Sequence, residues 1–326
     1  MWTEPGFQAE AEAWIRSQVP VSGPIEQTHV QPWSTVLRVP TDDDRPFWFK
    51  ACGEEHVFEP SLIELLSRLS PNRVPEMIAI HPERRWMLTR DAGTRLREMI
   101  ESDGRYEPWL EVLPGYAELQ IAAASHVDEI LSIGVPHEPL AGLADRVGLL
   151  LENPEYLMVG ETDGLAGDQI GEVREMLPEI DRLCSDLASL SIPESIQHDD
   201  LNDGNVFFDG FGYRVTDWGD ACVSHPFHSL TVQLRATAFR LDLEPGGPEI
   251  LRMRDAYLEP WTSMADRQTL VGAMGIAYRT GTLARSLAWF RYLAERDPAE
   301  WGDDVESIPY GLKKFLENGL LGSWRD

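Results

Sequence analysis

The spacing of apolar residues changes near residue 93, and this change constrains the fold more than any other feature. Before it, residues 5–19 have helical spacing, short apolar runs such as STVLRVP and FWFKA alternate with turns, and FEPSLIELLSRL is again helical. After it, helical stripes dominate, and strand-like runs return only in SIQH, NVFF and YRVTDW. This order predicts an α+β fold, with a small antiparallel sheet in residues 1–92 and a mainly helical region in residues 93–326.

Composition and charge limit the classes of partner. The formal net charge of −27 over 326 residues argues against a nucleic-acid partner, because phosphate backbones are bound by basic stripes. The acidity predicts either a field that attracts a cationic substrate or only a solvated surface. No apolar run approaches the roughly 18 residues that a membrane span needs, and the three cysteines lack CxxC spacing. We therefore expect a cytoplasmic protein without a membrane partner.

One segment, QHDDLNDGNVFFDGFGYRVTDWGDA, contains six aspartates around two short strand patterns. Like charges this close call for a cation or for a proton to accept. The runs VFF and YRV and the turn DGFG predict a hairpin whose ends bring the oxygens of Asn205 and Asp217 to one magnesium ion, with Asp200 facing outward. A calcium-binding EF-hand loop needs an oxygen-bearing side chain at its fifth position and a glutamate at its twelfth. Counted from Asp200, these positions are Gly204 and Phe211, so the EF-hand does not fit. A plain surface hairpin explains the turns but not this order of residues.

The segment resembles the catalytic segment of kinases, H-x-D-x-x-x-x-N followed by D-[FW]-G. It is more similar to that of the aminoglycoside phosphotransferase and choline kinase-like family, which commonly has H-G-D-L-H-x-x-N and then I-D-W. This chain has HDDLNDGN and then TDWG. Asp199 replaces the usual glycine, and Asn202 replaces the usual second histidine. The spacing to Asn205 and the leucine that follows identify Asp200 as the matching aspartate.

The resemblance implies a protein kinase-like fold with two lobes and a role for each matching residue. Asp200 would orient a substrate hydroxyl and accept its proton, while Asn205 and Asp217 would hold Mg2+ on the phosphates of ATP. His198 would support the loop instead of taking part in the chemistry. Phosphoryl transfer mainly requires alignment of the attacking oxygen and neutralisation of charge, which a base and a metal can supply.

Lys50, in the strand pattern FWFK, is the only lysine before residue 313, although arginine is frequent. A flexible point charge suits contact with the α- and β-phosphates, so we expect Lys50 to bind them. The alternative is a lysine at a strand end that reaches into solvent. The resemblance implies a helical glutamate beside this lysine, and Glu59 is the best match by position, with Glu64 and Glu55 as rivals.

Two more segments correspond to nucleotide-binding parts of the family. No G-x-G-x-x-G precedes Lys50, and the turn QPWST occupies its place. By resemblance, backbone amides and the hydroxyls of Ser34 and Thr35 would reach the phosphates; the alternative is an ordinary hairpin turn. The strand RWMLTR corresponds to the segment that links the lobes, which implies that Thr89 and Asp91 lie at the adenine site, mainly through their backbone.

These observations predict an ATP- and Mg2+-dependent kinase that phosphorylates a hydroxyl of a small molecule. The acidity and the resemblance favour a cationic acceptor such as an aminoglycoside, an amino sugar or an amino alcohol. The alternative function is a nucleotide-binding sensor that keeps the pocket without the reaction. Protein kinase activity is disfavoured, because no A-P-E segment follows at the usual distance.

Overall fold

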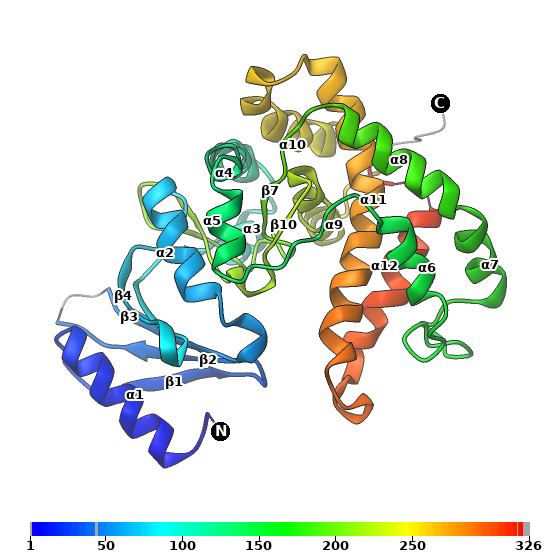
Figure 1. Cartoon of the computed structure of the whole chain (residues 1–326). Helices are drawn as coiled ribbons and strands as arrows, with labels where there is room; N and C mark the ends of the chain where they lie inside the picture. The colour runs from blue at the N-terminus through cyan, green and yellow to red at the C-terminus, as the bar shows by residue number, and fades with distance from the viewer. Residues whose placement is uncertain (1, 43–44, 318, 322–326) are drawn as a thin grey trace. The chain divides into compact units, whose positions relative to one another are not determined.

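The computed structural model describes residues 2–42, 45–317 and 319–321, and the chain forms two compact units (Figure 1). The first, here named the sheet unit, comprises Met1–Gly104, Asp128–Val135 and Asp203–Ala221. The second, the helical unit, comprises Arg105–Val127, Pro136–Asn202 and Cys222–Asp326. Both units are discontinuous in sequence.

An antiparallel sheet of five strands organises the sheet unit, in the order β1-β2-β3-β5-β4. The strands are β1 (Glu26–Val30), β2 (Ser34–Val39), β3 (Phe47–Cys52), β4 (Met77–His81) and β5 (Trp86–Arg90). Figure 1 shows helix α1 (Pro5–Gln18) along one face of this sheet and α2 (Glu59–Leu69) on the other. Successive side chains of a strand point to opposite faces, so Phe49 of β3 packs toward α1 while Lys50 points toward α2.

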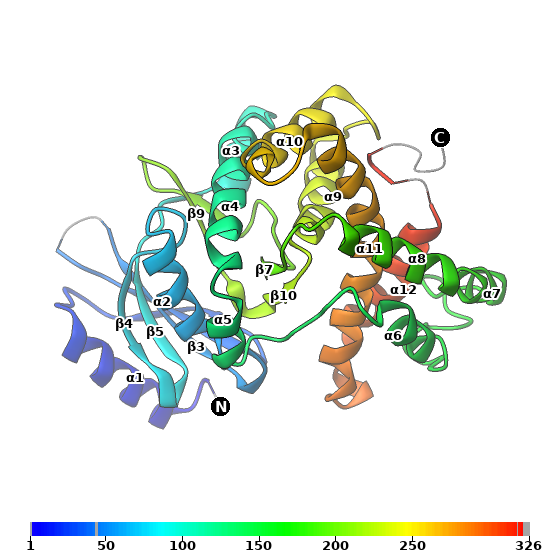
Figure 2. The same ribbon diagram turned by 45° about the horizontal axis from the view of Figure 1, so that its top comes forward.

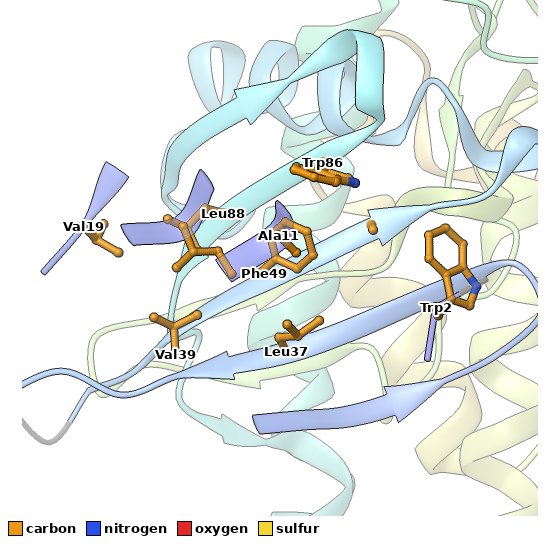
Figure 3. Close-up of a cluster of buried hydrophobic side chains, with 10 residues drawn as sticks. Trp2, Ala11, Val19, Leu37, Val39, Phe49, Trp86 and Leu88 are labelled. Carbon is orange, nitrogen blue, oxygen red and sulfur yellow. The ribbon is translucent and has the colours of Figure 1, made fainter. Parts of the chain in front are cut away.

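Apolar side chains between α1 and the sheet form the core of this unit (Figure 3). Ala11 and Ile15 of α1 are fully buried, as expected from their spacing of four residues on one helix face. They meet Phe49, whose ring packs edge-to-face on Trp86 with 5.5 Å between centroids. The other buried members are Trp2, Val19, Leu37, Val39, Ala51 and Leu88.

The predicted hairpin is present and belongs to the sheet unit. Strands β8 (Val206–Phe208) and β9 (Tyr213–Val215) pair antiparallel, and β8 also pairs with the two-residue strand β6 (Thr94–Arg95), which precedes helix α3 (Leu96–Asp103). The backbone N–H of Val215 donates to the carbonyl of Arg73 at 2.8 Å. These backbone bonds explain why residues 203–221 group with the sheet and not with the helices. Helix α5 (Val127–Ser132) lies largely in this unit as well.

Helices dominate the other unit, and their packing positions one short sheet. Strand β7 (Ser195–Gln197) pairs antiparallel with β10 (Cys222–Ser224). The fully buried Gln120 donates to the carbonyl of Ile196 at 2.8 Å and so ties helix α4 to β7. The helices are α4 (Trp109–Ala124), α6 (Leu143–Leu150), α7 (Gly167–Glu175), α8 (Leu177–Ser189), α9 (Ser229–Leu241), α10 (Pro248–Leu258), α11 (Arg267–Ala294) and α12 (Ser307–Leu316).

The longest helix, α11, spans 28 residues and therefore extends about 42 Å. It begins after Asp266, whose carboxylate accepts a hydrogen bond from the N–H of Thr269 at 3.0 Å and so caps the helix. Helix α12 packs beside it, as Figures 1 and 2 both show. Among the described residues, no helix combines the length and the apolar character that crossing a membrane requires.

Candidate active site

Lys50 lies at the centre of a charged cluster in the sheet unit. Its Nζ is 2.8 Å from Oε1 and 2.7 Å from Oε2 of Glu59, at the start of α2, and 2.5 Å from Oδ1 of Asp217. Of the three glutamates considered from the sequence, Glu59 is thus the one shown in contact with Lys50. Glu59 is fully buried, and its Oε1 also accepts the backbone N–H of Trp218 at 3.0 Å. The glutamate therefore binds both the lysine and the segment that carries Asp217.

The two carboxylates keep Lys50 charged. Burial by itself would lower the pKa of the Lys50 ammonium, but Asp217 and Glu59 outweigh it, and the pKa lies well above its ordinary value. The thiol of Cys52 lies 3.3 Å from Oε2 of Glu59 and is affected by the same carboxylate. Burial and the charge of Glu59 raise the pKa of Cys52, so the thiol stays protonated and unreactive.

The hairpin sets the place of Asn205 and Asp217. Val206 pairs with Val215, and the carbonyl of Asn205 accepts the N–H of Thr216 at 2.8 Å, so the two ends of the hairpin lie side by side. Asp217 then takes a left-handed backbone conformation with φ of 63°. Such conformations are costly for residues other than glycine and often occur at functional sites. The side chain of Asp217 is 58% exposed, which leaves its carboxylate accessible.

Gly219 and His56 are packed against each other directly after Asp217. A Cβ added at Gly219 would lie 2.9 Å from Nδ1 of His56, so this position of the DWG sequence requires a glycine. Nε2 of His56 is 3.7 Å from Asp220. The sequence did not single out His56, because its partner is 164 residues away and a lone histidine carries no motif.

The turn before β2 places Ser34 and Thr35 inside the unit. Ser34 is 4% exposed and Thr35 is fully buried. The hydroxyl of Thr35 donates to the carbonyl of His29 and accepts from the side chain of Gln27, both at 2.8 Å. These bonds join β1 to β2. We therefore do not count the Thr35 side chain among the groups that contact a nucleotide.

The segment after β5 is fixed by Asp91. Its Oδ1 accepts Nε1–H of Trp48 at 2.7 Å, and its Oδ2 accepts the N–H of Gly93 at 3.2 Å. The N–H of Asp91 donates to the carbonyl of Pro46 at 3.2 Å, and the hydroxyl of Thr89 donates to the carbonyl of Trp48 at 3.4 Å. The side chains of Thr89 and Asp91 thus hold the backbone of the segment in place.

Asp200 belongs to the helical unit, following β7. Its side chain is 33% exposed; Oδ1 is 3.5 Å from Nη2 of Arg285, and Oδ2 accepts from Nδ2 of Asn202 at 3.0 Å. His198 supports this loop from the interior of the unit. It is fully buried, and its backbone N–H donates to the hydroxyl of Tyr116 at 3.0 Å. Nδ1 of His198 accepts the N–H of Asp200 at 3.3 Å, the geometry of a structural support.

Residues 15–267 match the family model described as the phosphotransferase enzyme family. The chain belongs to this family. It is accordingly a phosphotransferase with an alcohol group as acceptor, and its expected relatedness to the aminoglycoside phosphotransferases is confirmed. Among curated protein sequences, no significant match to the phosphotransferase is found.

Solved structures show that the phosphotransferase has the predicted kinase-like fold. A choline/ethanolamine kinase family protein from Mesorhizobium loti is similar with a TM-score of 0.61, 16% identity and 96% of both chains covered. An ethanolamine kinase of Plasmodium vivax gives a TM-score of 0.60 at 12% identity, covering 93% of this chain and 85% of that one. The GDP and kanamycin complex of an APH(2") enzyme gives 0.58 at 14% identity, covering 94% and 97%.

Asp199 shows how the phosphotransferase accommodates its departure from the family pattern. It has φ of 61°, a conformation that glycine adopts easily and that aspartate tolerates better than most residues. Its carboxylate is 2.8 Å from Nη1 of Arg285, on α11, and accepts Nε2–H of Gln197 at 2.9 Å. The sequence did not indicate Arg285, because it lies in the helical run TLARSLAWF, 85 residues after Asp200.

Proposed function

We propose that this phosphotransferase is an ATP- and Mg2+-dependent kinase of small molecules, which transfers the γ-phosphoryl group to a hydroxyl. The observation that carries the proposal is the Lys50 ammonium held between the buried Glu59 and the exposed Asp217. A lysine that two carboxylates keep protonated and in place is suited to bind phosphate oxygens. Lys50 is on β3, and its side chain points to the face of the sheet away from the apolar core. This is the position that the resemblance gives to the phosphate-binding lysine.

Asn205 and Asp217 are the residues proposed to hold Mg2+. Their donor set fits this ion, because an amide carbonyl and a carboxylate are hard oxygen ligands, and Mg2+ on a nucleotide commonly uses one or two carboxylates together with phosphate oxygens and water. The contact of Lys50 with Asp217 supports the assignment, since this carboxylate already accepts a cation. When bound, Mg2+ would neutralise charge on the transferred phosphoryl group. The described residues contain no group of three or more His, Cys, Asp or Glu side chains that could hold a metal, so the proposed site uses Asn205 and Asp217 together with the phosphates of the nucleotide.

The nucleotide base is proposed to bind at the backbone of residues 89–93. The N–H groups of Asp91 and Gly93 have internal partners, so the N–H of Ala92 between them is the donor that we assign to adenine. Thr89 and Asp91 support this segment through their side chains. Backbone amides of the turn before β2 and the hydroxyl of Ser34 are assigned to the phosphates.

Asp200 is proposed to orient the acceptor hydroxyl and to take its proton. Conversion of Asp200 to asparagine is therefore the decisive variant. We expect Asp200→Asn to reduce turnover by about 100-fold or more, while ATP binds with nearly unchanged affinity, because the base acts in the transition state. Turnover equal to that of the wild type would end the assignment. Stabilisation by Mg·ATP without turnover on any hydroxyl compound would instead favour a nucleotide sensor.

The acceptor is proposed to be cationic, such as an aminoglycoside, an amino sugar or an amino alcohol. The net charge of −27 supports this class, and the similar structures carry the names choline/ethanolamine kinase, ethanolamine kinase and a kanamycin complex. An ATP-consumption screen with choline, ethanolamine, kanamycin, glucosamine and a macrolide, alongside neutral sugars, tests it. Activity confined to the neutral compounds would contradict a cationic acceptor.

We also propose a cytoplasmic location, where ATP is available and thiols stay reduced.

A further inference from the structure

Arg285 connects two adjacent aspartates of the catalytic loop to helix α11. Nη1 lies 2.8 Å from Oδ2 of Asp199, and Nη2 lies 3.5 Å from Oδ1 of Asp200. The arginine side chain is only 11% exposed, and its guanidinium also lies over the ring of Trp289, 5.2 Å from the centroid. A planar guanidinium with fixed donor directions can hold two carboxylates at a set separation, which a lysine cannot do.

The two aspartates differ in their surroundings. The side chain of Asp199 is 7% exposed, while that of Asp200 is 33% exposed. Asp199 is also fixed by the hydrogen bond from Gln197. Asp199 is therefore an internal anchor for the guanidinium, and Asp200 is the aspartate that a solvent-borne hydroxyl can reach.

The second departure from the family pattern acts on the same carboxylate. Nδ2 of Asn202 donates to Oδ2 of Asp200 at 3.0 Å and to the carbonyl of Asp200 at 3.1 Å. Arg285 and Asn202 thus hold different oxygens of one carboxylate. A carboxylate has about four acceptor positions, so Arg285 and Asn202 do not compete for the same position.

We propose that Arg285, anchored by Asp199 and assisted by Asn202, is a positioning residue that fixes the Asp200 carboxylate for phosphoryl transfer. This inference rests on the proposed role of Asp200. Asp199 stands where the family pattern has glycine, and its carboxylate forms an ion pair with Arg285 of α11 at 2.8 Å. The Arg285 guanidinium and the carboxylates of Asp199 and Asp200 together carry a formal net charge of −1.

The test uses the full chain and the acceptor that gives the highest turnover in the screen, or water as acceptor if only ATP hydrolysis is seen. We expect Arg285→Gln to lower kcat roughly 10- to 100-fold, with KM for ATP changed less than about twofold, because misplacing a base slows the chemistry more than it weakens binding. Arg285→Lys should recover part of the loss, since it keeps the charge but not the double contact. Asp199→Asn should lower kcat in the wild type but have little further effect in Arg285→Gln, because Asp199 acts only through Arg285.

Two controls separate positioning from folding. The double variant Asp199→Asn with Arg285→Gln removes both charges of the buried pair, so that neither is left uncompensated, and it should fold yet keep the low kcat. Arg267→Gln removes an arginine of the same helix that is paired with Asp255 at 2.8 Å, about 27 Å along the axis, and should leave kcat unchanged.

The outcomes distinguish this inference from the proposed function. If Asp200→Asn abolishes turnover while Arg285→Gln and the double variant keep the kcat of the wild type, the positioning role is wrong and the proposed function stands. Additive losses from Asp199→Asn and Arg285→Gln would also contradict it. If the wild type shows no turnover at all, or Asp200→Asn has no effect, the proposed function fails and the inference fails with it.

Discussion

Lys50 and Glu59 show how one buried contact determines the electrostatics of the sheet unit. Glu59 is fully buried, and a buried carboxylate without a cation is strongly unfavourable, so the lysine is needed for stability as well as for the proposed binding of phosphates. The sequence made Lys50 recognisable because it is the only lysine before residue 313. The choice among three glutamates needed the structure, because it depends on which carboxylate lies against the Lys50 ammonium, and the structure shows that of Glu59.

Removal of this lysine is predicted to destabilise the protein through its partner. Lys50→Met should lower the free energy of unfolding by about 3 kcal/mol, because Glu59 loses its counter-ion. The double variant Lys50→Met with Glu59→Gln should recover much of the loss, since the neutral amide can still accept from Trp218. Thermal and urea unfolding of the three proteins measures this. A double variant no more stable than Lys50→Met would show that the charge of Glu59 is not the cause.

Two buried histidines of the helical unit make stability depend on pH. His225 and His228 have ring centroids 5.8 Å apart. Burial lowers the pKa of His228 to about 4, and burial together with the nearby His228 lowers the pKa of His225 well below its ordinary value. In the unfolded chain each takes up a proton near pH 6.5, whereas in the folded protein His228 stays neutral until about pH 4. The free energy of unfolding should therefore decrease as the pH falls through this window, by up to about 1.4 kcal/mol per pH unit from each histidine.

We predict that His228→Gln flattens this dependence. Between about pH 6.5 and pH 4 the variant should lose stability less steeply than the wild type, because one proton fewer is taken up on unfolding. Urea unfolding at several pH values measures the slope. Identical slopes in His228→Gln and the wild type would contradict the prediction.

At the scale of elements, local patterns were sufficient for helices α1 and α2 and strands β2 and β3 but insufficient for the two-residue strand β6. The apolar spacing of α1 and α2 predicted these helices, because their buried faces repeat at the helix period, and the short apolar runs of β2 and β3 between turns predicted these strands. The hairpin of β8 and β9 was predicted from its turn. Strand β6 was not, since two residues carry no period and pair with Phe207 and Phe208, more than 110 positions away.

Gly93 is the residue on which this long-range pairing depends. It has φ of 93°, and an added Cβ would lie 2.1 Å from the carbonyl oxygen of Phe208. We predict that Gly93→Ala destabilises the protein by more than the roughly 1–2 kcal/mol of a left-handed alanine, because β6 and β8 must also move apart. Gly104→Ala is the control, since Gly104 also has positive φ but no atom near its would-be Cβ. Equal losses of thermal stability in the two variants would show that the contact with Phe208 is unimportant.

At the scale of the whole molecule, charge and the division into units were predictable to different degrees. Net charge is a sum over the sequence and requires no structure. The compact units could be found only in the structure, because the chain passes from the helical unit to the sheet unit between Asn202 and Asp203, within the segment that resembles the catalytic segment of kinases. Asp200 therefore belongs to one unit, while Asn205, Asp217 and Lys50 belong to the other.

The net charge of −27 leads to a prediction about salt. If the acidic field attracts the acceptor, KM for a polycation such as kanamycin should rise roughly threefold or more between about 0.05 M and 0.5 M NaCl, because salt screens the attraction. KM for a neutral acceptor at the same salt concentrations is the comparison. A KM for the cation that does not change with salt would mean that the acidity only solvates the surface.

The central claim is that this chain transfers a phosphoryl group from ATP to an alcohol. The most direct measurement is to incubate the protein with γ-labelled ATP and the panel of hydroxyl compounds, with and without Mg2+, and to identify the labelled product by mass spectrometry. We predict an acceptor that carries the labelled phosphoryl group on a hydroxyl, and only when Mg2+ is present. Label that stays in ATP with every acceptor, or a phosphorylated product formed equally well without any divalent ion, would contradict the account.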